Sequence, residues 1–177
     1  GFEYNLFVRS GKLVVIDIDE IEHQKNTVSI DYFIHADIAD VLRDLDLGTY
    51  LTRESWTSKC NHWKKKWPTC LKEYDNDKEG INMYYFTGAL SNFLPQGVAV
   101  VCDAGSAGYV PYQGLFLEEG QRFIIPAAQL EMGFTLPGMI GACVANDKKK
   151  TIGITGDGSF MLNIQELQTI VHLNLPV

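Results

Sequence analysis

The sequence lacks the features of a membrane-spanning or disulfide-stabilised protein. No apolar run among its 177 residues is long enough to span a bilayer, and no signal-peptide pattern opens it. Only four cysteines are present, and none of them form a closely spaced pair of the metal-binding kind. Cys102 and Cys143 lie in apolar segments and are expected to be small core residues. This cysteine usage favours a reducing compartment, and we predict a cytoplasmic protein with no membrane association.

Positive charge is also scarce, since 15 Lys and Arg residues face 22 Asp and Glu residues and the formal net charge is −7. The two dense basic runs, residues 64–66 and 148–150, are short and are interpreted as solvated surface. This balance argues against a nucleic-acid partner. Hydrophobic residues make up 46% of the chain, which is enough for a packed core.

The first and last residues have no signals of a domain start or end. Residues 1–10 contain no clear start signal, and residues 175–177 have the pattern of the entry to a strand. We therefore expect the chain to be a piece of a longer polypeptide.

Residues 1–46 have the pattern of the tail of an α/β domain. Residues 12–18 predict a buried strand and residues 28–34 a weaker one. Asp37 is predicted to cap a short helix whose apolar residues recur at i, i+3, i+4 and i+7.

Residues 47–80 have the composition of a linker that includes one connecting helix. Four residues at spacings of four, three and four are predicted to form one apolar face of that helix: Trp56, Cys60, Trp63 and Trp67. We interpret them as a packing stripe on an apolar surface rather than a ligand-binding box.

Residues 81–177 alternate between predicted helices and strands, and we predict a separate binding domain there. Continuous apolar runs at 98–102 and 151–154 indicate buried strands. Helices are predicted near 83–93, at 134–145 and after Gly158, the last with Phe160, Ile164, Leu167 and Val171 on one face. The fold class is therefore α/β, a mostly parallel sheet with helices on both faces. Ligands bind such sheets at the carboxyl ends of the strands, where Gly105 and Gly156 lie.

The stretch Thr-Ile-Gly-Ile-Thr-Gly-Asp-Gly-Ser-Phe at residues 151–160 predicts a strand, a tight turn and the start of a helix. Free N–H groups at a helix start favour phosphate oxygens. One carboxylate together with phosphate oxygens and waters is a common way to hold Mg²⁺. The turn therefore predicts a cation between Asp157 and a diphosphate, and a plain Asp-Gly turn is the alternative.

The same turn resembles a known motif. Residues 156–160, continued by 163–169 and 174–177, resemble the diphosphate-binding motif of thiamine-diphosphate-dependent enzymes, in particular the large subunit of acetolactate synthase. The family motif continues to an asparagine that completes the Mg²⁺ site, beyond Val177.

Two further stretches agree with this resemblance. Residues 131–142 are similar to the family's cofactor-bending segment, and residues 103–106 match a second loop that touches the diphosphate. Upstream, residues 16–19, the pair Lys25 and Asn26, and the helix capped by Asp37 resemble the end of the family's central domain. The resemblance implies that residues 1–46 are the tail of that domain and that residues 81–177 bind the cofactor.

The resemblance implies a site for thiamine diphosphate and Mg²⁺, with Asp157 as the metal ligand and Met132 as a wedge between the two cofactor rings. The family often has glycine where this chain has Leu130, and the contacts there are made by the main chain. Glu131 lies next to the site, but the motif does not assign it the activating role. The implied cofactor-binding residues are Ala104, Gly105, Ser106, Leu130, Glu131, Met132, Gly156, Asp157, Gly158 and Ser159.

The implied activity is decarboxylation of a 2-oxo acid such as pyruvate and transfer of the two-carbon unit to an acceptor. The family's catalytic glutamate lies on an earlier domain, and no residue here matches it, so residues 1–177 alone are expected to be inactive. The resemblance also implies a homodimer or homotetramer with the active site between subunits, and FAD is not readable from this stretch. The alternatives are a non-ligating decarboxylase, a non-catalytic cofactor-binding homologue and a dinucleotide-binding module at residues 103–108.

Overall fold

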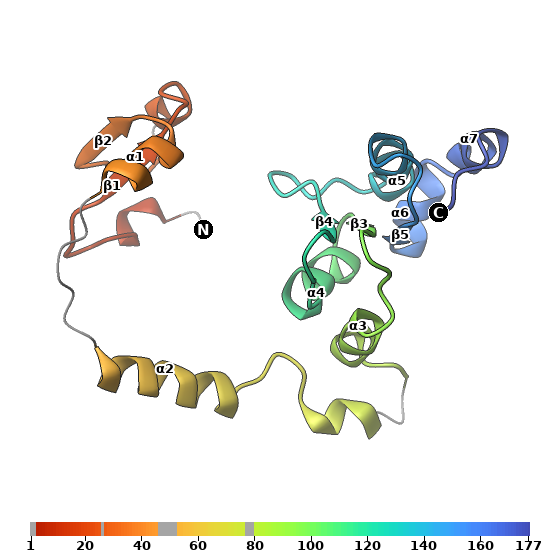
Figure 1. Ribbon diagram of the computed structural model, residues 1–177, viewed down its shortest axis with the longest axis horizontal. Coiled ribbons are helices and arrows are strands. Elements are labelled where there is room, and N and C mark those ends of the chain that lie inside the picture. The colour runs from red at the N-terminus through yellow and green to blue at the C-terminus, as the bar shows by residue number, and fades with distance from the viewer. Residues whose placement is uncertain (1–2, 26, 46–52, 77–79) are drawn as a thin grey trace. The chain divides into compact units, whose positions relative to one another are not determined.

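The computed structural model describes residues 3–25, 27–45, 53–76 and 80–177, and the chain forms two compact units, Gly1–Glu54 and Ser55–Val177 (Figure 1). Asn26 and part of the predicted linker, residues 47–52 and 77–79, lie outside the described residues. The division into a tail, a linker and a binding domain remains a prediction. Within the described ranges, no helix combines the length and apolar character that a membrane crossing requires.

The first unit contains two short parallel strands, β1 (Val14–Asp17) and β2 (Tyr32–His35), paired from Val14 with Tyr32 to Asp17 with His35. Helix α1 (Ile38–Asp44) follows, and the Asp37 carboxylate accepts a hydrogen bond from the Ala39 N–H at 2.7 Å, as predicted for its cap. Two 3-10 turns complete the unit, η1 (Tyr4–Leu6) and η2 (Glu22–Gln24).

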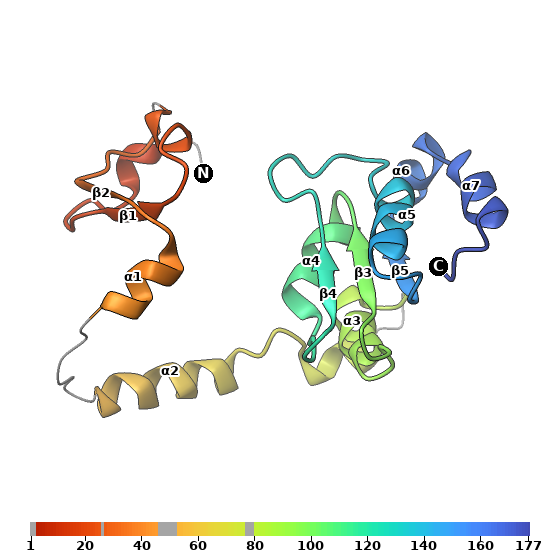
Figure 2. The ribbon, with the colours of Figure 1, turned by 45° about the horizontal axis from the view of Figure 1, so that its top comes forward.

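The second unit is built on a parallel three-stranded sheet in the order β4 (Arg122–Ile124), β3 (Ala99–Cys102), β5 (Thr151–Ile154). Figure 2 shows β3 and β4 lying side by side. Its helices are α2 (Glu54–Lys66, which starts in the last residue of the first unit), α3 (Met83–Ser91), α4 (Ser106–Gly114), α5 (Thr135–Ala145), α6 (Asp157–Leu162) and α7 (Glu166–His172), with a 3-10 turn η3 (Lys72–Asn76).

The central strand β3 is buried on both faces. Alternate side chains of a strand point to opposite sides, and each side of β3 packs against its own apolar cluster. Val100 and Cys102, with Val98 just before the strand, face one apolar cluster that includes Leu94 and Leu115. Val101 faces the other cluster with Leu136 and Met139 of α5. All four residues of β3 are at most 2% exposed. The predicted class is confirmed: an α/β fold with parallel sheets flanked by helices.

The tryptophan stripe was interpreted wrongly. The helix exists as α2, but Trp56 and Trp67 are 54% and 63% exposed and no residue of α2 is buried. The stripe packs on itself instead, since the Trp56 and Trp63 rings meet edge-on at 5.8 Å and the Lys59 ammonium lies 5.0 Å from the centroid of the Trp63 ring.

The single helix predicted after Gly158 was also wrong, because α6 ends at Leu162 and α7 begins at Glu166. Asn163 interrupts the helix, and its side-chain amide donates to the Gly133 carbonyl at 2.8 Å. Helix α4 and strand β4 were not predicted. Glycines and an internal Pro111 weaken the helical signal of α4, and β4 is only three residues long.

Candidate functional site

Two glycine turns lie at the carboxyl edge of the sheet, where β3 and β5 end. Gly105 precedes α4 with φ +62° and ψ −149°, a conformation that only glycine adopts readily. Gly156 precedes α6. A Cβ atom added at either glycine would meet nothing within 4 Å, so both turns leave open space for a ligand to approach the backbone.

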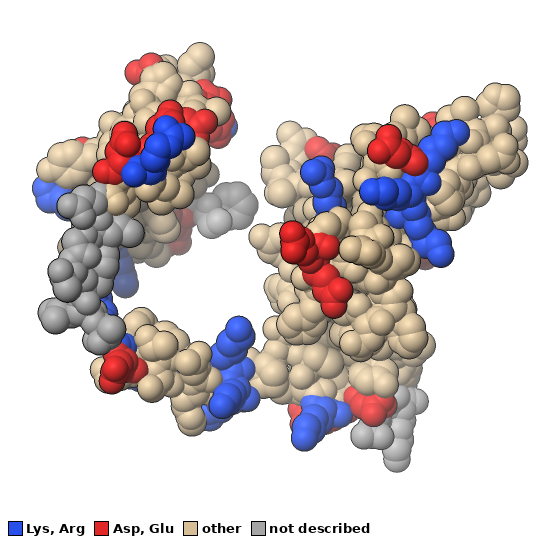
Figure 3. All heavy atoms as spheres, viewed as in Figure 1, with Lys and Arg blue, Asp and Glu red and all other residues tan. Residues whose placement is uncertain are grey.

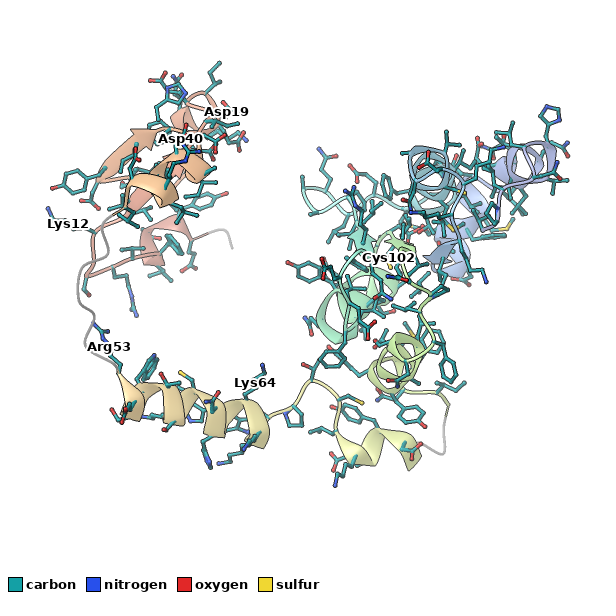
Figure 4. The ribbon with its side chains drawn as sticks, viewed as in Figure 1. Lys12, Asp19, Asp40, Arg53, Lys64 and Cys102 are labelled. Carbon is teal, nitrogen blue, oxygen red and sulfur yellow. The ribbon has the colours of Figure 1, made fainter. Side chains whose placement is uncertain are left out.

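Asp103, which directly follows β3, is the buried centre of this edge. Asp103 is fully buried, and it is the next residue after Cys102, which is one of those labelled in Figure 4. Its Oδ2 accepts hydrogen bonds from the hydroxyls of Thr135 (2.7 Å), Thr155 (2.8 Å) and Ser159, and its Oδ1 accepts from the Ala104 N–H (2.8 Å). One carboxylate thus joins the end of β3, the start of α5, the end of β5 and the first turn of α6.

The ionisation of Asp103 follows from these donors. Burial raises the pKa of the carboxyl, but the hydrogen bonds from Ser159, Thr135, Thr155 and the Ala104 amide together lower it more, so the net pKa lies below its ordinary value. The neighbouring Cys102 shows the opposite case. Burial, with the Asp103 charge, raises the pKa of that thiol to about 12, so Cys102 stays a neutral core residue.

Residues 130–133 lie against the first turn of α6. The Gly133 N–H donates to the Ser159 hydroxyl oxygen at 2.6 Å, and the Gly133 carbonyl accepts from Asn163. Gly133 has φ +85°, and an added Cβ would lie 2.9 Å from Asn163 Nδ2 and 3.1 Å from Leu162 Cβ. Glycine is therefore required at residue 133 both for its dihedral and for its close approach to α6.

Met132, within this segment, lies next to the glycine turn of α6. The side chain is 55% exposed, and a Cβ added at Gly158 would be 3.4 Å from Met132 Cε. Leu130 takes φ +55°, which is uncommon for a residue other than glycine. It also lines an open cavity of about 210 Å³ together with Tyr109, Tyr112, Ile125 and Ala127.

Asp157 is exposed at the start of α6, and its Oδ1 accepts from the Gly158 N–H at 2.8 Å. Among the described residues, no group of three or more His, Cys, Asp or Glu side chains is arranged to hold a metal ion. A cation at Asp157 would therefore need oxygens from a ligand and water. An exposed carboxylate and two open glycine turns together fit a diphosphate with a divalent cation.

The structure places the ten predicted site residues on three segments at this edge: 104–106, 130–132 and 156–159. It brings Met132 next to Gly158, and it joins Ser159 to Asp103, the residue before Ala104. The Ser159 side chain is only 5% exposed and its hydroxyl is used internally. Four residues that organise this site are not among the predicted ones: Asp103, Thr135, Thr155 and Asn163. Asp103 could have been found from the sequence, because it is a carboxylate directly after a fully apolar strand.

Comparison with known proteins agrees with this arrangement. Residues 103–177 match the family described as "Thiamine pyrophosphate enzyme, C-terminal TPP binding domain". This segment therefore matches the thiamine-diphosphate-dependent enzyme family, and the resemblance stated from the sequence is confirmed.

Relatives of the chain include acetolactate synthases. The chain is 31% identical over 180 residues to acetolactate synthase 3, chloroplastic, of Brassica napus, covering 97% of this chain and 27% of the relative. It is 31% identical over 182 residues to the probable acetolactate synthase large subunit of Methanocaldococcus jannaschii, covering 97% and 30%. It is 28% identical over 175 residues to acetolactate synthase isozyme 2 large subunit of Escherichia coli, covering 98% and 30%. The chain thus resembles acetolactate synthase large subunits along almost its whole length but spans under a third of theirs.

Proposed function

We propose that this chain is the cofactor-binding part of a thiamine-diphosphate- and Mg²⁺-dependent enzyme that decarboxylates a 2-oxo acid such as pyruvate and transfers the two-carbon unit to an acceptor. The observation that carries the proposal is the pairing of an exposed Asp157 with Met132, whose methyl group lies beside Gly158 in the same turn. The names of the relatives support the transfer step.

The residues divide the work of binding. Asp157 would ligate Mg²⁺, and backbone N–H groups of residues 104–106 and 156–159 would face the diphosphate. Ser159 would contribute through its backbone, because its hydroxyl is already bonded to Asp103 and Gly133. The main chain at Leu130 and Glu131 would hold the aminopyrimidine, while Met132, bulky and polarizable, would keep the two rings bent together.

Bound thiamine diphosphate supplies carbanion chemistry at its thiazolium ring, and the protein binds, orients and excludes water. Of the residues in this chain, Met132 would contribute its side chain at the rings. The activating glutamate of the family is not among residues 1–177, so a polypeptide limited to them should not consume pyruvate. Measurable turnover by that polypeptide would contradict the family mapping of the site.

The assembly and setting are part of the same proposal. We expect a homodimer or homotetramer in a cytoplasmic location, with a small 2-oxo acid as substrate and no nucleic acid as partner. On the face shown in Figure 3, basic and acidic atoms are interspersed rather than gathered into one basic band. A non-ligating decarboxylase and a non-catalytic cofactor-binding homologue remain the alternatives.

The test is calorimetric titration of thiamine diphosphate with Mg²⁺ into the full-length protein and its Asp157→Ala variant. Because Asp157 would be one of few protein ligands, affinity should fall at least about tenfold, and its dependence on Mg²⁺ should weaken. Glu119→Ala, another exposed carboxylate in the same unit but on the loop before β4, is the matched control and should bind as the wild type does. Unchanged affinity in Asp157→Ala would refute the metal assignment.

A further inference from the structure

Ser159 and Asn163 of the α6 region hold a single residue, Gly133, at both of its backbone polar groups. The Ser159 hydroxyl oxygen accepts from the Gly133 N–H at 2.6 Å, and the Asn163 side-chain amide donates to the Gly133 carbonyl at 2.8 Å. The two residues are four positions apart, so they lie on the same side of the α6 turn. The peptide groups before and after Gly133 are therefore both fixed by α6.

The first of these peptide groups belongs to Met132 as well, because it joins the Met132 carbonyl carbon to the Gly133 nitrogen. A rotation of that peptide group would break the bond to Ser159. The side chain of Met132 remains 55% exposed, whereas Ser159 is 5% exposed and Gly133 is buried. Met132 thus has an exposed side chain, and the peptide group that follows it is fixed by the hydrogen bond to Ser159.

Asp103 sets the direction of the Ser159 hydroxyl. An ionised carboxylate has no proton to donate, so the hydroxyl must donate to Asp103 and its lone pairs are left for the Gly133 N–H. The same carboxylate accepts from Thr155, at the end of β5. The turn that carries Asp157 and the segment that carries Met132 are therefore connected through one buried serine.

We propose that Ser159 and Asn163 are positioning residues that hold residues 130–132 against the Gly156–Gly158 turn, so that Met132 and Asp157 act on a ligand as one unit. The functional part of this proposal rests on the thiamine-diphosphate function proposed above. The structural part stands without it, because the hydrogen bonds to Gly133 exist without a ligand.

The first experiment measures amide hydrogen exchange in the full-length protein without cofactor. Ser159→Ala and Asn163→Asp should each accelerate exchange in residues 130–133 by about tenfold or more, because each removes one hydrogen-bond partner of Gly133 and loosens the segment. Asn163→Asp is nearly isosteric, so it also serves if Ser159→Ala folds poorly.

The chain offers a matched control for each variant. Ser91, like Ser159, accepts from a backbone N–H, that of Phe116 (3.0 Å), and its hydroxyl donates to the Thr87 carbonyl (2.8 Å). Asn146, which caps the end of α5 as Asn163 caps α6, donates to the Gly97 carbonyl at 2.9 Å. Ser91→Ala and Asn146→Asp should leave exchange in residues 130–133 unchanged. Unchanged exchange there in both Ser159→Ala and Asn163→Asp would overturn the proposal.

The second experiment measures turnover of pyruvate and affinity for thiamine diphosphate with Mg²⁺. Ser159→Ala should lower kcat about tenfold while affinity changes less than about threefold, because the diphosphate contacts of Asp157 and the glycine turns remain. In a Met132→Ala background, Ser159→Ala should cause little further loss, since the side chain it positions is gone. Fully additive losses would overturn the positioning role. Wild-type protein that does not bind thiamine diphosphate would instead refute the proposed function, and the exchange experiment would still decide the structural part.

Discussion

Each unit of the molecule has an aspartate at the carboxyl end of a parallel strand, and the two are held in different ways. Asp17 ends β1, its side chain is 38% exposed, and its Oδ2 lies 3.0 Å from Nε2 of His23. Asp103 follows β3, is fully buried and accepts from three hydroxyls and a backbone amide.

The neighbours of each strand account for the difference. Within the described residues, strand β1 pairs with β2 alone, whereas β3 has a strand on each side and apolar clusters on both faces. A carboxylate at the end of a buried central strand loses water, so it is stable only when protein donors replace that water. The pKa of Asp17 is lowered mainly by the hydrogen bond from His23 and then by the Asp19 amide. At Asp103, donors from three segments are needed.

The comparison separates two uses of a carboxylate at a sheet edge. A buried one such as Asp103 has both carboxylate oxygens hydrogen-bonded to the protein, so it organises the backbone around it. An exposed one such as Asp157, which accepts from the Gly158 N–H through Oδ1, stays accessible to a cation. In this chain the buried Asp103 bonds to Ser159, which lies two residues after the exposed Asp157.

The largest effect should come from Asp103→Ala, which leaves the hydroxyls of Thr135, Thr155 and Ser159 without their shared acceptor. We expect a loss of about 3 kcal/mol or more and a clear fall in melting temperature. Asp17→Ala should shift the melting temperature far less, because water replaces the lost contact to His23. Differential scanning calorimetry of the full-length protein measures both. Equal shifts of the melting temperature in Asp103→Ala and Asp17→Ala would show that the two aspartates contribute alike to stability.

Two methionines of the second unit allow a functional role to be separated from a packing role. Met132 is 55% exposed and Met139 of α5 is 8% exposed. Met132→Ala should lower turnover per cofactor-saturated site about tenfold or more with little change in melting temperature, and Met132→Leu should keep most activity. Met139→Ala should cost about 2–5 kcal/mol of stability with normal turnover per folded site. A large loss of stability with normal turnover in Met132→Ala would assign Met132 to the core.

Much of the second unit could be predicted from sequence because its strongest signals are local. The apolar run of β3, the small-residue helix α5 and the glycine turn at Gly156 each lie within about a dozen residues. The resemblance then located the three site segments. The tryptophans of α2 show the limit of such signals, since spacing shows that residues share a face but not that anything covers it.

The contacts that organise the site could not be read in this way, because they join distant positions. The hydroxyl donors to Asp103 are 32, 52 and 56 residues away, and Asn163 reaches Gly133 across 30 residues. Threonine and serine are common in every kind of segment, so nothing local identifies those that bond a particular carboxylate. The break between α6 and α7 has the same origin, because the apolar spacing continues through Asn163 while its side chain bonds elsewhere.

Lowering the pH should reduce the stability that ionised Asp103 contributes to the second unit. The folded-state pKa of Asp103 is below its ordinary value of 3.8, so the folded protein binds this proton less tightly than the unfolded chain. The stabilisation is fully present above the unfolded pKa and is lost as pH falls through the lower folded pKa. The difference in melting temperature between wild type and Asp103→Asn should therefore narrow as pH falls from about 6 to about 3. Melting curves that stay parallel over this range would mean that Asp103 is not ionised in the fold.

The smallest effect concerns the backbone beside Met132. Leu130 has φ +55°, a conformation in which a residue with a Cβ costs roughly 1 kcal/mol more than glycine. Leu130→Gly relieves that cost but adds about as much conformational freedom to the unfolded chain and removes a half-buried side chain, so stability should change by less than about 1 kcal/mol. Gln129→Gly, an exposed neighbour outside the left-handed region, has no strain to relieve and should be destabilised by about 0.5–1 kcal/mol. Melting temperatures of both variants measure the contrast. If Leu130→Gly is clearly the more destabilised of the two, then the packing of the leucine side chain beside Tyr109 outweighs the strain of its backbone.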